Sequence, residues 1–81
     1  MTKAITPEQI QQIQKTYNGH ENKAEEHLQR YQKEHKRIYL HFHEYYLTKA
    51  AAIKEVMKIL GFDCSYSAFA PEDQHYVFKS A

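Results

Sequence analysis

The chain has 81 residues, 42% of them hydrophobic and 26% charged, which fits a single small domain with a thin core. Its net charge of +1, with histidine neutral, gives no general attraction to nucleic acid or anionic lipid. No apolar run approaches the roughly 20 residues that a membrane-spanning helix needs. The first residues also lack the apolar segment of a secretory signal. We therefore expect one soluble, cytoplasmic domain over residues 1–81.

A single cysteine, Cys64, leaves no disulfide within the chain to stabilise so small a scaffold, and it agrees with a reducing compartment. Stability must then come from packing or from a partner. The composition leans toward Lys, Gln, Tyr and Ile, which is typical of short proteins of low-GC bacteria and their phages.

A short first helix is predicted over about residues 7–17. Thr6 is a suitable cap, a proline follows it, and Gln9 completes a capping-box pattern with Thr6. The apolar residues of the segment fall on one helical face: Ile10, Ile13 and Tyr17. Asn18-Gly19 is predicted to end this helix, because glycine tolerates the left-handed conformation common at helix ends.

A long central helix is predicted over about residues 20–60, since neither Pro nor Gly occurs from Glu21 to Leu60. Its acidic start and basic end match the helix dipole. A helix of about forty residues would be roughly 60 Å long, far more than this chain can cover. It must bend near Leu47-Thr48 or bind a partner. One apolar face continues throughout, with His35 expected to be buried in it: Ala24, Leu28, Tyr31, His35, Ile38, Phe42, Tyr45, Lys49, Ala52, Val56 and Ile59.

Beyond Gly61 the pattern changes to alternation, with Phe62, Cys64 and Tyr66 on one side of an extended segment. Residues 70–74 supply a polar turn, and residues 75–78 are a second β-prone run. We expect a C-terminal β-hairpin over about residues 62–79, packed on the end of the central helix because an isolated hairpin is marginal. Its contacts there would be Ile53, Met57 and Leu60. The predicted fold class is α+β, mainly α.

Catalytic and metal-binding patterns are weak. Cys64 with His75 is the only pair of nucleophile and base, and Cys64 in an alternating strand is more simply a small buried hydrophobe. None of the histidine groupings has the spacing of a zinc site: His41 with Glu44, His35 with Tyr39 and His43, and Cys64 with His75. We expect no enzyme, no cofactor and no metal site.

A basic cluster in the central helix is the alternative functional feature. Arg30, Lys33, Lys36 and Arg37 lie near tyrosines that could stack on bases, which would suit a nucleic-acid-binding accessory protein. Glutamates interrupt this basic field, and the spacing is also that of an ordinary solvated helix face. Nucleic acid is therefore the less favoured partner.

Apolar surface exceeds what one small chain can cover, because a second row adjoins the first on the central helix: Tyr39, Tyr46, Ile53 and Leu60. Aromatic helical surfaces of this kind are typical of interface anchors. We predict a small interaction or regulatory protein that self-associates, as a dimer or larger homo-oligomer, or binds a larger protein, without contacting a membrane. The predicted interface comprises Tyr31, His35, Ile38, Tyr39, Phe42, Tyr45 and Tyr46.

Overall fold

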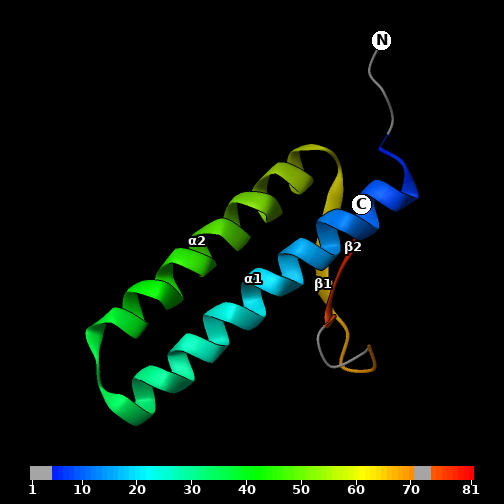
Figure 1. Cartoon of the computed structure of the whole chain (residues 1–81). Coiled ribbons are helices and arrows are strands. Elements are labelled where there is room, and N and C mark those ends of the chain that lie inside the picture. Colours follow the sequence, from blue (N-terminus) through cyan, green and yellow to red (C-terminus); the bar gives the residue numbers. More distant parts are fainter. Residues whose placement is uncertain (1–4, 71–73) are drawn as a thin grey trace.

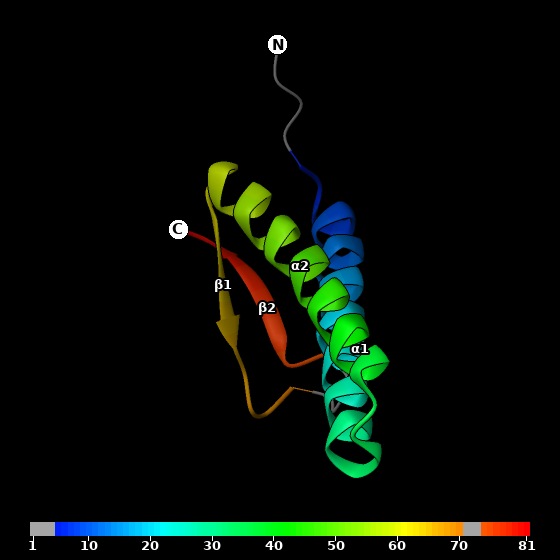
Figure 2. The same ribbon diagram turned by 90° about the vertical axis from the view of Figure 1, so that its left-hand side faces the viewer.

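The computed structural model describes residues 5–70 and 74–81. In chain order it contains α1 (Pro7–Glu34), α2 (Arg37–Ile59), β1 (Phe62–Tyr66) and β2 (Tyr76–Ser80). The two helices run antiparallel side by side (Figure 1), and the two strands lie on one side of the helix pair (Figure 2). The fold class is therefore α+β and mainly α, as predicted. Neither helix in the described ranges has an apolar stretch sufficient to cross a bilayer.

The start of α1 confirms the predicted capping box. The Gln9 backbone N–H donates to Thr6 Oγ1 at 3.1 Å, and the Thr6 backbone N–H donates to Gln9 Oε1 at 3.0 Å. The predicted end at Asn18-Gly19 is wrong, because α1 continues to Glu34. Asn18 is buried, and its side chain bonds the backbone of Tyr76 in β2. A tertiary contact, rather than a helix end, explains Asn18 at this position.

The helices are separated at His35 and Lys36, so the prediction of one central helix over about residues 20–60 is wrong. His35 has the left-handed φ of 55°, and its backbone N–H donates to the Tyr31 carbonyl at 2.8 Å. His35 is exposed, which corrects the expectation that it is buried. The predicted bend at Leu47-Thr48 is also absent, since α2 continues through it. Folding back at His35 lets each helix cover the other, as a single long helix cannot.

The predicted C-terminal hairpin is confirmed. Gly61, with a φ of 92°, connects α2 to β1, and β1 pairs antiparallel with β2 in a register that sets Cys64 opposite Phe78. Within the predicted turn at residues 70–74, Pro71, Glu72 and Asp73 lie outside the described residues, as does the segment 1–4 of the chain. The sheet packs on the Met57 end of α2, as predicted.

The core lies where the sheet meets both helices. Its buried members come from three elements: Tyr17, Ala50, Met57 and Phe78. The Tyr17 ring meets the rings of Tyr76 and Phe78 edge-on, with centroid distances of 5.4 and 5.2 Å. Through this aromatic cluster the sheet packs against α1, and through Met57 it packs against α2.

Away from the sheet, and among the described residues, α1 and α2 pack only on each other. His43 Nδ1 lies 2.7 Å from the Ala24 carbonyl oxygen, and the His27 ring stacks on Tyr46 at 5.6 Å and on Tyr39 at 6.3 Å. The contacting residues of α2 follow a spacing of four and three, and we call them the inner row: Tyr39, His43, Tyr46, Ala50, Ile53 and Met57.

Candidate protein interface

A second row on α2, next to the inner row, is exposed. Its residues again alternate in steps of four and three, and we call them the outer row: Ile38, Phe42, Tyr45, Lys49, Ala52, Val56 and Ile59. This spacing is the heptad repeat of a coiled-coil seam. The five large apolar members are exposed by 41% for Phe42, 52% for Tyr45, 55% for Ile38 and Val56, and 78% for Ile59. Within the described residues, α2 therefore carries a helix-pairing seam that no helix covers.

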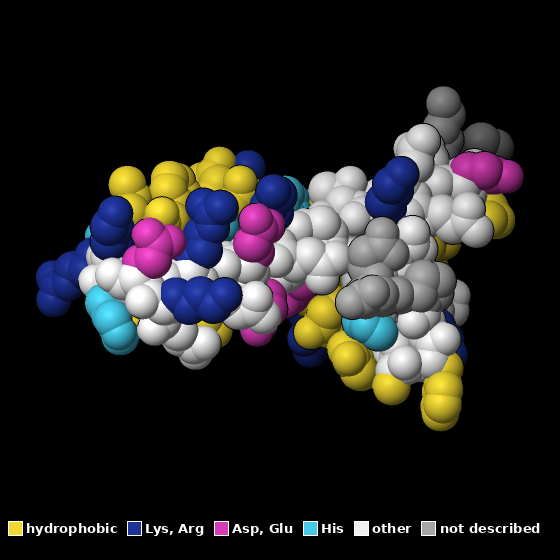
Figure 3. Space-filling view, turned by 60° about the horizontal axis from the view of Figure 1, so that its bottom comes forward, with side chains coloured by type: hydrophobic (Ala, Val, Ile, Leu, Met, Phe, Trp, Pro, Cys, Tyr) yellow, Lys and Arg dark blue, Asp and Glu magenta, His cyan; other side chains and the backbone are white. Residues whose placement is uncertain are grey.

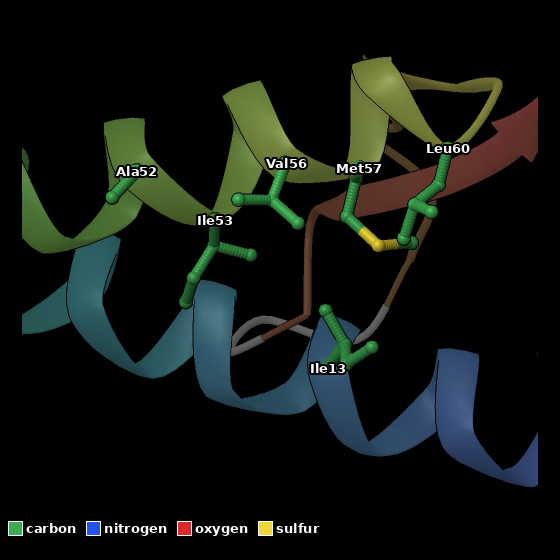
Figure 4. A pocket seen from close by; sticks show the side chains of 6 residues that line it. All are labelled: Ile13, Ala52, Ile53, Val56, Met57 and Leu60. Carbon is green, nitrogen blue, oxygen red and sulfur yellow. The ribbon is translucent and has the colours of Figure 1, made fainter.

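An apolar groove adjoins the outer row at the end of α2. It has a volume of about 300 Å³ and is lined by Ile13 of α1, by four residues of α2 and by the residue that follows α2: Ala52, Ile53, Val56, Met57 and Leu60. Figure 4 shows Ile13 projecting from α1 toward the α2 side chains that form the other wall. Ligand pockets usually carry a few polar groups that orient a small molecule, and the lining of this groove has none. Its chemistry suits the apolar side chain of a protein partner.

The predicted interface residues divide between the two rows and the turn. Ile38, Phe42 and Tyr45 belong to the outer row and lie together on the surface. Tyr39 and Tyr46 are half-buried against His27, so they contribute to the helix pair rather than to the open seam. Phe42 stands at the border, because it is partly exposed while its ring centroid lies 5.0 Å from that of His27.

The remaining predicted interface residues, Tyr31 and His35, lie at the end of α1 and in the turn. The predicted interface omitted Ala52 and Val56, which belong to both the outer row and the groove, and Ile13. It also omitted His27, whose Nδ1 is buried without a hydrogen-bond partner in the described structure. His27 lies in heptad spacing with Ala24 and Tyr31. This spacing would have indicated that His27 faces α2, if the helix break at His35 had been known.

Lys49 is the one charged member of the outer row. Its Nζ lies 4.5 Å from the centroid of the Tyr45 ring, which places the ammonium against the negative face of the aromatic system. A hydrogen bond with Tyr45 raises the pKa of Lys49, so this side chain stays charged at neutral pH. Any partner of the outer row must accommodate a cation near its middle.

The four basic residues predicted as the alternative site come together around the turn between the helices, and all are exposed: Arg30, Lys33, Lys36 and Arg37. Carboxylates accompany them. Lys36 Nζ lies 4.0 Å from Glu34 Oε1, and Lys and Arg side chains stand beside Glu side chains on this end of the molecule (Figure 3). Arg30 also lies 5.7 Å from the Tyr39 ring centroid. The basic surface is therefore broken up by negative charge.

The groupings considered for metal binding or catalysis can be located in the structure. The described residues contain no group of three His, Cys, Asp or Glu side chains that could hold a metal ion. His35 lies in the turn, while His43 faces α1. His75 Nδ1 lies 3.0 Å from the Ser67 carbonyl oxygen, and its ring stacks on Tyr66. Burial raises the pKa of the Cys64 thiol, which lowers the thiolate fraction that a nucleophile requires.

Comparison of the chain with models of known protein families, with curated proteins and with solved structures finds no match. Function is therefore inferred from the described surface alone.

Proposed function

We propose that the protein is a small interaction protein that self-associates through the outer row of α2. The observation that carries this proposal is the exposure of five large apolar side chains in heptad register on one helix. Single exposed hydrophobic residues are ordinary, whereas a contiguous apolar patch marks an interaction site. Such a protein acts by presenting and occupying surfaces rather than by chemistry on a substrate.

The thin core of the chain supports the proposal. Among residues 5–70 and 74–81, the buried apolar side chains are Tyr17, Ala24, Ala50, Met57 and Phe78. A chain of this size buries a smaller share of its surface than a larger one, so a second layer of helices would add substantially to its core. Association that occurs only in the folded state also stabilises the fold by mass action.

Two neighbouring alanines in α2 allow a matched test. Ala51 and Ala52 are both exposed in the middle of the helix, but only Ala52 belongs to the outer row and the groove. Replacing either by Asp has the same cost in helix propensity. Only Ala52→Asp would place an unpaired carboxylate inside the interface, where burial of charge is unfavourable.

The experiment compares Ala51→Asp, Ala52→Asp and the unchanged protein by sedimentation velocity at micromolar concentration, with circular dichroism as a check of folding. We expect the unchanged protein and Ala51→Asp to associate, and Ala52→Asp to be a folded monomer. Association of Ala52→Asp as strong as that of Ala51→Asp would contradict the proposal.

A further inference from the structure

We propose that two copies pair their outer rows antiparallel about a two-fold axis, with Phe42 of each copy entering the groove beside Ala52 of the other. This inference rests on the proposed self-association and adds to it a direction, a register and a role for the groove. Three features of the outer row carry it: the place of its single charge, the sizes of its side chains, and the polar residues beside it.

The position of Lys49 sets the direction. In a parallel, in-register pair, Lys49 of one copy would meet Lys49 of the other inside an apolar seam, which leaves two like charges together. An antiparallel pair removes this direct contact, because each Lys49 then faces a different residue and the two Lys49 positions are offset by four residues, roughly 6 Å, along the seam. When Lys49 faces Tyr45 of the other copy, it meets the kind of ring over which its ammonium already lies within its own chain.

The sizes of the side chains set the register. With Lys49 opposite Tyr45, the other layers place Phe42 opposite Ala52 and Ile38 opposite Val56, as the alternating spacing of the row requires. Phe42, a bulky aromatic residue, then meets Ala52, the smallest residue of the row. Such pairing keeps the distance between the two helices even along the seam, as close packing requires.

Neither register shifted by one heptad has this balance. The shift in one direction places Lys49 opposite Ile38 and leaves Ala52, Val56 and Ile59 with no facing residue in α2. The shift in the other direction places Lys49 opposite Ala52, and Phe42 opposite Ile59. The layers at the centre would then be thin and those at the ends thick, so the helices could not pack evenly along their length.

The groove provides the site for Phe42. In knobs-into-holes packing, a residue opposite Ala52 enters the space between four side chains of the facing helix. Here those residues are Lys49, Ala52, Ile53 and Val56, and the last three line the groove. The small side chain of Ala52 leaves its mouth open, and Ile13 of α1 closes its far wall (Figure 4). The groove therefore has the position and the chemistry to receive a phenyl ring.

The residues flanking the seam are also complementary. In the proposed register, His41 of each copy lies beside Glu55 of the other, and both are exposed in the single chain. Thr48 lies beside Thr48 of the other copy, directly on the two-fold axis. A histidine and a carboxylate form a favourable pair across a helix interface, and no like charges meet among these flanking contacts.

Chemical cross-linking of single cysteines tests the arrangement. Cys64→Ser supplies a background without other thiols, and Thr48→Cys, Ala52→Cys and Glu55→Cys are then made separately in the full chain. Each is treated with a short bismaleimide and separated under denaturing conditions. In the proposed pair, two copies of residue 48 are adjacent, whereas two copies of residue 52 are offset by ten residues, roughly 15 Å at 1.5 Å per residue.

We expect cross-linked dimer from Thr48→Cys in large excess over the other two variants. Equal yields from Thr48→Cys and Glu55→Cys would indicate the register shifted by one heptad, and the highest yield from Ala52→Cys would indicate a parallel pair. Either result overturns the inference. Sedimentation of the same samples separates the two proposals, because a dimer without cross-linking at Thr48 contradicts only the register, whereas a monomer contradicts self-association as well.

Discussion

Asn18 of α1 hydrogen-bonds both backbone polar groups of Tyr76 in β2, 58 residues later in the chain. The Tyr76 N–H donates to Asn18 Oδ1 at 2.8 Å, and Asn18 Nδ2 donates to the Tyr76 carbonyl at 2.8 Å. One turn earlier in α1, Gln14 Oε1 accepts from the Phe78 N–H at 3.0 Å. Two amide side chains therefore replace a third strand along the outer edge of β2, which would otherwise present unpaired backbone groups.

Removing the Asn18 amide should weaken the fold. We expect Asn18→Ala to lower the free energy of unfolding by about 2–3 kcal/mol, because two backbone groups of Tyr76 lose their partners in a partly buried site. Urea denaturation followed by circular dichroism measures the change. Gln11→Ala, at an exposed position of the same helix, should change stability by less than about 0.5 kcal/mol. A similar small effect for Asn18→Ala would show that these bonds contribute little.

Alkaline pH should destabilise the protein through Tyr17. Burial, reinforced by the carboxylate of Glu21, raises the pKa of Tyr17 well above its ordinary value of about 10. The unfolded chain therefore releases this proton at lower pH than the folded chain does. The stability it contributes is fully present below about pH 10 and is lost as the pH rises further. Burial also raises the pKa of Tyr76 and of Cys64, which act in the same direction.

The variant Tyr17→Phe isolates this effect. Above about pH 10 its free energy of unfolding should fall less steeply than that of the unchanged protein, by up to about 1.4 kcal/mol per pH unit for one proton. Denaturation series at neutral and alkaline pH provide the comparison. Identical slopes for both proteins would exclude Tyr17 as the source of alkaline instability.

The turn between the helices should prefer glycine. His35 adopts a left-handed conformation that costs most residues roughly 1–2 kcal/mol but is open to glycine. We expect His35→Gly to leave stability unchanged or to raise it by up to about 1 kcal/mol, and His35→Val to lower it. Thermal melting of both variants tests this order. A more stable Val variant would mean that the helices do not break at His35.

The basic cluster should not bind nucleic acid at physiological ionic strength. Phosphate binding would require an uninterrupted positive surface, and here Lys36 lies beside Glu34. Fluorescence anisotropy with duplex and single-stranded probes should show no affinity that falls with salt. Salt-dependent binding that is abolished by combining Lys33→Glu with Lys36→Glu would contradict this expectation. The basic cluster, rather than the outer row, would then be the functional surface.

Periodicity predicted the elements of the fold, but not where the long helical segment breaks. The apolar spacing of Tyr31, His35 and Ile38 continues through the turn, and no Pro or Gly marks it. A local pattern cannot distinguish one long helix from two that fold back, because both have the same period. Asn18-Gly19 was misleading for the converse reason, since its role depends on Tyr76 in a distant strand.

The candidate site was predictable only in part. Spacing identified both apolar rows of α2, and the predicted interface included Ile38, Phe42 and Tyr45 of the outer row. It could not decide which row α1 covers, because Tyr39 and Tyr46 are as aromatic as Phe42 and Tyr45. That choice depends on the position of α1, which follows from the break at His35 and the docking of the sheet. The groove forms only where α1 packs beside α2, so no pattern within one segment of the sequence indicates it.

Sedimentation equilibrium of the unmodified protein and of Phe42→Asp, over a micromolar concentration range, is the most direct test of the role assigned to the outer row. We predict that the unmodified protein reaches the mass of a dimer or larger assembly as concentration rises. Phe42→Asp should remain a monomer, because association would bury an unpaired carboxylate. An unmodified protein with monomer mass throughout this range would contradict self-association. The outer row would then be a binding surface for a different protein.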